Sequence, residues 1–333
     1  MIRPDFIAGL PKSELHVHHV GSASPRIVSE LAQRHPEAGV PSDPAQLAEF
    51  FTFRDFAHFI QVYLAVVGLI TDAEDVRTLT YGVAGDLAAQ QVRYAELTIT
   101  PFSSIHRGIP AEAFCEAIED ARVAAERDLG IVLRWCFDIP GEAGLPSAEV
   151  TLDTAERIRP DGLVSFGLGG PEIGVPRGQF QPYFDRARAL GLHSVPHAGE
   201  TTGPETIWDS IRLLGAERIG HGTSSMLDPE LVDYLRENRI ALEVCPTSNL
   251  ATRAVASLTE HPLPRMVEAG LLVTINSDDP PMFSTTLNNE YGIAADLLGL
   301  DEAGLKALAG NAVTASFAPD DVKQRLLSEI AAY

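Results

Sequence analysis

The stretch ELHVHHVGS, at residues 14–22, places three histidines within four residues, a density that suits a metal site. Side chains alternate along a β-strand, so His16 and His18 project to one face while His19 points the other way. Two imidazoles on one face can bind a single metal ion together. By itself this H-x-H pair is a weak signal, because ordinary core or surface histidines also occur at that spacing.

Other ionisable residues follow further β-prone runs. VPHAGE carries His197 and Glu200, IGHG carries His221, and NSDDP carries Asp278 and Asp279. Burying so many ionisable groups at one end of a fold is costly unless they pair with one another or with a cation. The sequence therefore predicts one divalent ion per chain, bound by His16, His18, His197 and Asp278. Nitrogen and oxygen ligands suit zinc first, with iron, cobalt or manganese as alternatives.

A regular alternation of strands and helices would bring these residues together. Eight β-prone runs, separated by helix-length segments, are expected at 14–20, 92–99, 131–139, 162–168, 192–197, 218–222, 241–246 and 272–277. This alternation predicts a (β/α)8 TIM barrel, whose strands end at a common mouth where active sites lie. The G-x-G-x-x-G turn of a nucleotide-binding open sheet does not follow the first strand.

The segment from about 25 to 90 is longer than one crossover needs and predicts a helical insertion that caps the barrel mouth, within a single domain of residues 1–333. Aromatic residues recur there at helical spacing, at Phe53, Phe56, Phe59 and Tyr63. Such a stripe either lines an apolar pocket or belongs to ordinary core.

Composition limits the partners. The formal charge of -21 carries no basic run, which excludes nucleic acid and an anionic membrane surface as partners. Three widely spaced cysteines and the absence of a signal-peptide or membrane-spanning run predict a cytoplasmic protein. Cys245 is expected to be a buried strand residue rather than a nucleophile, and the oligomeric state is left open.

Taken together, the motifs PKSELHVH, GLGGPE, PHAGE, RIGHG, EVCPTSN and NSDDP resemble the adenosine deaminase family of metal-dependent (β/α)8 barrels. The resemblance implies the four metal ligands named above, with Asp278 also counted among the catalytic residues. It implies that Glu200 protonates the purine and that His221 orients or deprotonates the attacking water. It further implies that Asp279 binds ring nitrogen 7 and that the backbone amide of Gly170 meets ring nitrogen 3.

These roles agree with the chemistry of an amino-purine. Addition of hydroxide at carbon 6 pushes charge onto ring nitrogen 1, so a protonated carboxyl group is needed beside it, and a buried glutamate with a raised pKa meets that need. Simpler interpretations are a helix cap for Glu200, a turn former for Asp279 and a tight bend at Gly170.

Two departures from the family pattern concern the substrate. Classical adenosine deaminases have an acidic residue for the ribose 5′-hydroxyl where this chain has Val20, and many relatives have arginine where this chain has Thr98. By strand parity Val20 is expected to face the same interior as His16 and His18. An unpaired buried hydroxyl there would cost about 1–3 kcal/mol.

An apolar 5′ substituent therefore fits best, and the opening HVHHVGSASPR resembles the branch of the family that deaminates 6-amino-6-deoxyfutalosine in menaquinone biosynthesis. Adenosine, deoxyadenosine and other 5′-modified adenosines are alternatives, while free adenine fits less well. Arg26, and after it Arg177, is the expected partner of the substrate carboxylate. A non-catalytic barrel is disfavoured because all the motif residues are present. A related amidohydrolase is disfavoured because such enzymes usually have a lysine on strand four, and the segment VSFGLGG contains none.

Overall fold

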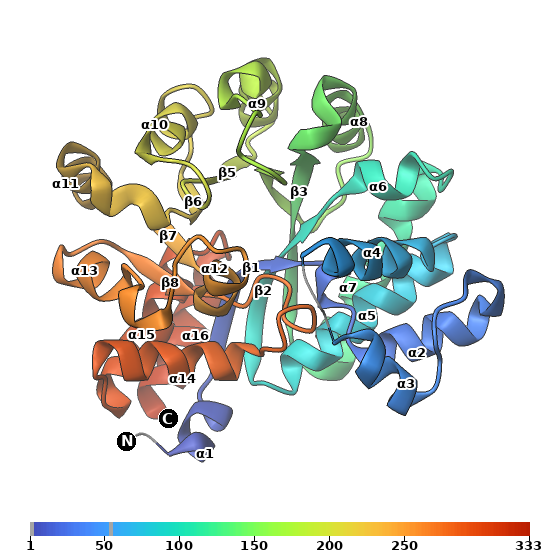
Figure 1. Cartoon of the computed structure of the whole chain (residues 1–333), viewed down its shortest axis with the longest axis horizontal. Coiled ribbons are helices and arrows are strands. Elements are labelled where there is room, and N and C mark those ends of the chain that lie inside the picture. The colour runs from blue at the N-terminus through green and yellow to red at the C-terminus, as the bar shows by residue number, and fades with distance from the viewer. Residues whose placement is uncertain (1–2, 53–55) are drawn as a thin grey trace.

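Eight parallel strands occupy the centre of the molecule and helices surround them (Figure 1). The computed structural model describes residues 3–52 and 56–333. The strands are β1 (Lys12–His18), β2 (Val92–Ile99), β3 (Val132–Pro140), β4 (Leu163–Gly169), β5 (His193–Ala198), β6 (Arg218–His221), β7 (Ala241–Val244) and β8 (Val273–Ile275). They are hydrogen-bonded in sequence order, so the predicted (β/α)8 barrel is confirmed.

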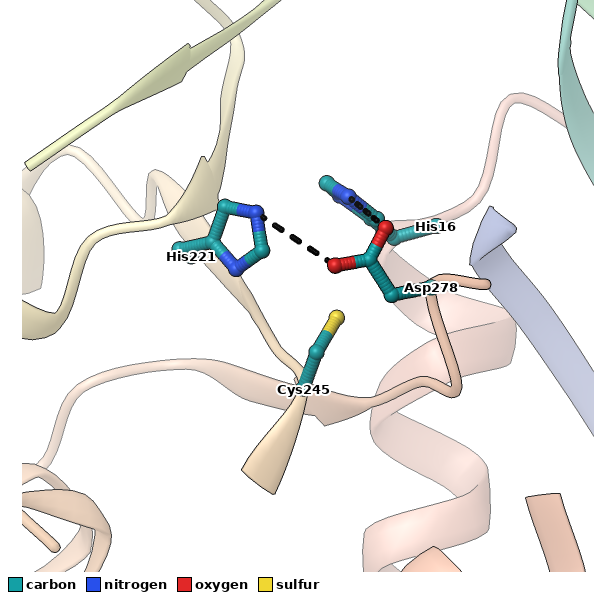
Figure 2. Close-up of side chains that lie close together, drawn as sticks. All are labelled: His16, His221, Cys245 and Asp278. Atoms are coloured by element: carbon teal, nitrogen blue, oxygen red, sulfur yellow. Dashed lines mark ion pairs between the residues drawn. The ribbon is translucent and has the colours of Figure 1, made fainter. Parts of the chain in front are cut away.

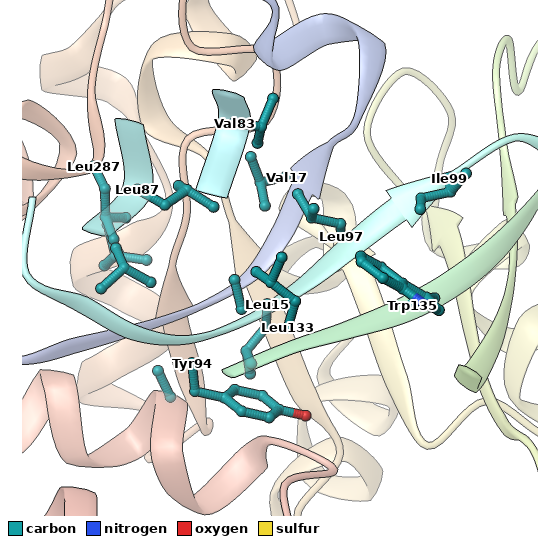
Figure 3. Packing of buried hydrophobic residues seen from close by; sticks show 14 of the residues in the cluster. Leu15, Val17, Val83, Leu87, Tyr94, Leu97, Ile99, Leu133, Trp135 and Leu287 are labelled. Carbon is teal, nitrogen blue, oxygen red and sulfur yellow. The ribbon is translucent and has the colours of Figure 1, made fainter. Parts of the chain in front are cut away.

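The strands are apolar on both faces because helices cover the outside and side chains fill the inside. Figure 3 shows Leu15, Leu97 and Leu133, from three neighbouring strands, within this buried cluster. Trp135 on β3 is also fully buried. Buried charged side chains also lie within the strands, where Arg218 pairs with Glu96 and Glu243. The predicted site residues lie at or beyond the strand ends.

The barrel closes through contacts between β1 and the residues just after β8. The backbone N–H of His18 donates to Asp278 O at 2.9 Å, and the N–H of Asp278 donates to His16 O at 3.1 Å. Because β8 has only three residues, the side chain of Asn276 completes the seam: its Oδ1 accepts from the N–H groups of Leu15 and His16 at 2.9 and 3.2 Å. The seam therefore holds the strand of the histidine pair against the loop that carries Asp278.

Helices form the outer layer and the additions to it. They are α1 (Pro4–Gly9), α2 (Pro25–Arg34), α3 (Pro44–Phe50), α4 (Phe56–Gly68), α5 (Ala73–Ala88), α6 (Pro101–Ile105), α7 (Ala111–Leu129), α8 (Gly144–Arg157), α9 (Gln181–Ala189), α10 (Pro204–Arg212), α11 (Pro229–Glu237), α12 (Pro246–Ala251), α13 (Leu263–Glu268), α14 (Leu287–Leu298), α15 (Glu302–Ala315) and α16 (Asp320–Ala332). Over residues 3–52 and 56–333, none of the helices has the length and apolarity that crossing a membrane requires.

Four helices, α2 to α5, connect β1 to β2. The last of them, α5, packs against α7 and β2 as an outer barrel helix does, whereas α4 packs against the short 3-10 helix Val20–Ser22 that follows β1. Burial raises the pKa of the half-buried Tyr63 on α4, and the charges of Asp279 and Asp138 raise it further, which places Tyr63 near the barrel mouth. Of the predicted aromatic stripe, Phe53 and the side chains of Phe56 and Phe59 lie outside the described part of the chain.

Candidate active site

Three imidazoles converge at the carboxyl ends of β1 and β5. His16, His18 and His197 each offer a ring nitrogen, and these atoms all lie within 4.8 Å of one another. The alternation along β1 places His16 and His18 together because both lie within the strand. The structure thus brings the predicted histidines together from segments far apart in the sequence.

Asp278 lies against this cluster, as Figure 2 shows for His16 and His221. Its Oδ1 is 3.2 Å from His18 Nε2 and 3.6 Å from His16 Nε2, and its Oδ2 is 3.8 Å from His221 Nε2. Burial alone would raise the pKa of Asp278, but its interactions with the two β1 histidines hold it well below its usual value. Asp278 and His221 both have a left-handed backbone, with φ of 64° and 63°, a conformation that non-glycine residues adopt at some energetic cost.

A buried ion-pair network orients His16. Its Nδ1 donates to Glu243 Oε2 at 3.0 Å, and Glu243 Oε1 accepts from Arg218 Nε at 2.6 Å. Arg218 also pairs with Glu96 at 2.5 Å. With Nδ1 occupied, His16 Nε2 is the atom turned toward the cluster, and it is buried without a hydrogen-bond partner. A carboxylate on the far nitrogen of a metal-binding histidine fixes the ring in this way.

His197 is oriented by the backbone. Its Nδ1 donates to Leu168 O at 3.1 Å, which turns Nε2 toward His18 Nε2 at 3.2 Å. Burial and the neighbouring histidines lower the pKa of His197 well below its usual value, so this imidazole is neutral, as a metal ligand must be.

The cluster fits a divalent cation. The uncompensated Nε2 of His16, the convergence of two further imidazoles and an ionised carboxylate supply three nitrogen donors and one oxygen donor. This donor set is typical of zinc sites. The residues predicted from the sequence therefore lie close enough together, and have suitable donor atoms, to hold the ion.

Cys245 also lies among these groups, near His16, His221 and Asp278 (Figure 2). Burial raises the pKa of its thiol well above the usual value, and its Sγ donates to Glu243 O at 3.6 Å. A buried, protonated thiol is a poor nucleophile.

His221 lies between the predicted acid and the predicted metal ligand Asp278. The amide of Asn249 donates to His221 Nδ1 at 3.1 Å, and His261 Nε2 donates to Asn249 Oδ1 at 3.3 Å. A neutral His221 whose Nδ1 accepts carries its proton on Nε2, which is 3.6 Å from Glu200 Oε2. The imidazole can therefore donate toward the centre of the site.

Glu200 follows β5 and remains accessible. Its side chain is 15% exposed, and it borders a cavity of about 540 Å³ formed by the loops that follow β5, β6 and β7. The neighbouring helix α10 begins after Gly203, which provides no side-chain cap. Glu200 therefore does not cap that helix, and its carboxyl group is left to face His221.

A second glutamate holds the loop that carries Glu200. Glu172 Oε2 accepts from the N–H groups of Thr201 and Thr202 at 2.7 and 2.9 Å, and also from both hydroxyls. Its other oxygen is 3.7 Å from Nη2 of Arg177, which is fully buried. Arg177 thus supports this loop.

Of the two residues expected to orient a purine, Gly170 follows β4 and Asp279 lies in the loop after β8. Gly170 has a φ of 75°, a backbone conformation that favours glycine. Asp279 packs directly on Gly21, where a Cβ would lie 1.4 Å from Asp279 Oδ1. Burial and the charge of Asp278 raise the pKa of Asp279.

The parity argument for Val20 is wrong, because β1 ends at His18 and Val20 begins a 3-10 helix. Strand alternation therefore stops before Val20 is reached. The half-buried side chain lines a small cavity with Val67 and Ile99. The segment nevertheless borders the site, since the next residue, Gly21, contacts Asp279.

Arg26 lies on α2 with its guanidinium directed at α5. Nη2 donates to Asp86 Oδ1 at 2.9 Å and to Gly82 O at 3.0 Å. The side chain is 56% exposed. A substrate carboxylate at Arg26 would therefore have to displace Asp86.

His19 points away from the other two β1 histidines and donates from Nε2 to Thr80 Oγ1 at 2.8 Å. Thr80 is an acceptor here because its own proton goes to Val76 O. Burial lowers the pKa of His19 to about 3. An unfolded histidine has a pKa of about 6.5, so the unfolded state takes up a proton over a range in which the folded state does not.

His19 should therefore make the protein less stable as the pH falls below about 6.5, by about 1.4 kcal/mol at about pH 5.5. Urea unfolding of the wild type and of His19→Gln at about pH 7.5 and 5.5 measures this loss of unfolding free energy. The variant should lack the contribution from His19. An identical pH dependence in the two proteins would contradict a buried, neutral His19. His193→Gln, at an exposed position on β5, is the control.

Comparison with known proteins extends the match beyond these motifs. The family model described as adenosine deaminase matches residues 11–333. An aminodeoxyfutalosine deaminase from Streptomyces avermitilis is 71% identical over 330 residues, which cover 98% of this chain and 92% of the relative. The structure of an adenine deaminase from Arthrobacter aurescens is 30% identical, with a TM-score of 0.89 and coverage of 97% and 99% of the two chains. The structure of an amidohydrolase from Burkhoderia ambifaria with bound Zn is 26% identical, with a TM-score of 0.86 and coverage of 99% and 95%.

Proposed function

Because the chain belongs to the adenosine deaminase family, we propose that it is a hydrolytic deaminase that converts 6-amino-6-deoxyfutalosine to futalosine and ammonia in menaquinone biosynthesis. The observation that carries this substrate is the near full-length identity to the Streptomyces avermitilis enzyme, which far exceeds the identity to the adenine deaminase. The family is metal-dependent, and the site contains every residue that the chemistry requires.

We propose zinc as the ion, held by His16, His18, His197 and Asp278. Bound there, it would act as a Lewis acid that makes water nucleophilic in neutral solution. Glu243 and the carbonyl of Leu168 contribute by turning two of the imidazoles so that their Nε2 atoms face the ion.

The protein groups then divide the proton transfers. Glu200 donates a proton to ring nitrogen 1 as the attacking oxygen adds to carbon 6, so that negative charge does not build up on the ring. His221, with its Nε2 directed at the centre, holds the attacking oxygen and passes a proton toward the departing ammonia. The hydrogen bond from Asn249 to His221 Nδ1 holds the imidazole ring in this orientation.

Two further groups orient the purine. We assign ring nitrogen 7 to Asp279 and ring nitrogen 3 to the backbone amide of Gly170. Both assignments rest on the family resemblance, and for Asp279 also on its position next to Asp278 and in contact with Gly21. With nitrogens 1, 3 and 7 all contacted, carbon 6 is directed at the site of attack.

Parallel assays test the substrate. Ultraviolet absorbance distinguishes the amino-purine from its hypoxanthine product, so aminodeoxyfutalosine, adenosine and adenine can be compared at one enzyme concentration. We expect kcat/KM to be highest for aminodeoxyfutalosine. A preference for adenosine would overturn the substrate and leave the deaminase chemistry intact.

Val20→Asp should shift specificity toward adenosine. An aspartate at this position would accept from the 5′-hydroxyl and place a charge near an apolar, carboxylated substituent. The ratio of kcat/KM for aminodeoxyfutalosine to that for adenosine should fall by about 10-fold or more, since an unpaired polar group costs about 1–3 kcal/mol. Val20→Asn is the uncharged control, and an unchanged ratio in Val20→Asp would separate Val20 from the 5′ end of the substrate.

Arg26 stays our first candidate for the substrate carboxylate. Its exposure permits exchange of partners, because surface ion pairs contribute only about 0–1 kcal/mol. Removing its partner by Asp86→Ala should leave the guanidinium available for the substrate, so the KM for aminodeoxyfutalosine should fall. An unchanged KM would separate Arg26 from the substrate carboxylate.

A further inference from the structure

The carboxyl group of Glu200 is hydrogen-bonded by a residue that the proposed chemistry does not yet use. Thr252 Oγ1 lies 2.7 Å from Glu200 Oε1. The same hydroxyl lies 3.0 Å from Ser248 O, one helical turn earlier. A hydroxyl has a single proton, so Thr252 can donate to only one of these oxygens at a time.

The two carboxyl oxygens of Glu200 therefore have different surroundings. Oε1 faces the Thr252 hydroxyl, and Oε2 faces His221 Nε2 at 3.6 Å. In a protonated carboxyl group the unprotonated, carbonyl-like oxygen is the better hydrogen-bond acceptor. The Thr252 hydroxyl lies within hydrogen-bond distance of Oε1, whereas His221 Nε2 lies beyond that distance from Oε2. The bound donor at Oε1 therefore favours the acidic proton on Oε2.

The Thr252 hydroxyl lies at the end of a short helix that is anchored to α14. Thr252 is the C-terminal cap of α12, whose first turn is anchored where Glu290 of α14 accepts from the N–H of Thr247 at 3.0 Å. Thr252 and Glu200 both line the 540 Å³ cavity, so the hydrogen bond lies at the rim of the space beside the acid. A hydroxyl held in this way can fix the carboxyl plane in one orientation.

We propose that Thr252 is a positioning residue that binds Oε1 of Glu200 and so presents the proton on Oε2 toward the substrate. This inference rests on the proposed function, in which Glu200 is the general acid. When Oε1 does not accept its proton, the Thr252 hydroxyl can donate to Ser248 O instead, which holds the side chain in the same orientation.

Thr252→Val tests the proposal because it keeps the shape of the side chain and removes the donor. Glu200 becomes a charged carboxylate as its proton leaves, so the lost hydrogen bond is one to a charged group in the transition state. We therefore expect kcat to fall by about 10- to 100-fold, while KM stays within about twofold because the bond matters mainly in the transition state. Metal content, measured in parallel, should equal that of the wild type. Thr252→Ser keeps the hydroxyl and should restore most of kcat.

Thr154→Val is the matched control. Thr154 Oγ1 donates to Val150 O on α8, the same contact one turn back, and it lies outside the site. Its kcat should equal that of the wild type, which isolates the bond to Glu200 from the bond within the helix. If Thr252→Val does not fold, Thr252→Ala removes the same donor without adding a methyl group.

The outcomes separate this inference from the proposed function. A wild-type kcat in a folded Thr252→Val or Thr252→Ala variant overturns the role of Thr252 alone. A Thr252→Ser variant as impaired as the valine variant also overturns it, since the hydroxyl would not be what matters. A wild-type protein that deaminates none of the amino-purines overturns the proposed function, and this inference with it.

Discussion

Glu200→Gln should lower kcat by about 10²–10⁴-fold, the usual contribution of a general acid, with little change in KM. Glutamine keeps the length of the side chain and can still accept from Thr252 Oγ1, but it has no acidic proton for ring nitrogen 1. Steady-state deamination followed by ultraviolet absorbance, with metal content determined on the same samples, measures the effect.

Glu205→Gln is the matched control for this variant. Glu205 lies in the first turn of α10, just after the loop that carries Glu200, is exposed, and accepts from the N–H of Gly203. It should turn over at the wild-type rate. Near-normal turnover in Glu200→Gln, with the control also normal, would show that another group delivers the proton.

His197→Ala should remove metal and activity together. The loss of one of four ligands should lower kcat by more than about 100-fold, because changes to groups behind the ligands alone already cost about 10–100-fold. Metal content by elemental analysis should fall in parallel, and added zinc should restore only part of the activity.

His193→Ala, four residues earlier on the same strand, provides the comparison. His193 is half exposed and pairs with Glu217 away from the site, so its removal should leave metal content and turnover unchanged. Full metal occupancy in His197→Ala would exclude His197 from the ligand set.

The sequence predicted the strands and the gathering of the site because both depend on local pattern. Apolar runs with regular spacing identify barrel strands, and a barrel gathers strand ends at one mouth whatever the details of packing. The alternation along β1 also separated His16 and His18 from His19, which the structure places against Thr80.

The prediction for Val20 failed because a local pattern stopped, and the partner of Arg26 was not foreseen. The parity of Val20 was extrapolated past the end of β1, and no residue type there marks that boundary. Arg26 stays a prediction, but its partner Asp86 on α5 was not foreseen, because that contact depends on how two helices pack. Helix packing is a tertiary property that sequence periodicity does not give.

The supporting groups were missed for a related reason. Glu243 binds His16 from 227 residues away, and Thr252 binds Glu200 from 52 residues away. A charged residue inside the short apolar run ALEVCP was a signal for Glu243, since a buried carboxylate needs a partner. Thr252 had no comparable signal, because a threonine at a helix end is common.

The seam of the barrel imposes an order on how the site comes into being. Leu15 and Asn276, which its hydrogen bond joins, are 261 residues apart. Contacts over such separations form only after the entropy of closing the intervening loop has been offset by other structure. During synthesis, the β1 histidines therefore emerge long before Asp278 exists to meet them, so a growing chain has at most a partial ligand set. We therefore expect the chain to acquire the ion late, only after the barrel has closed.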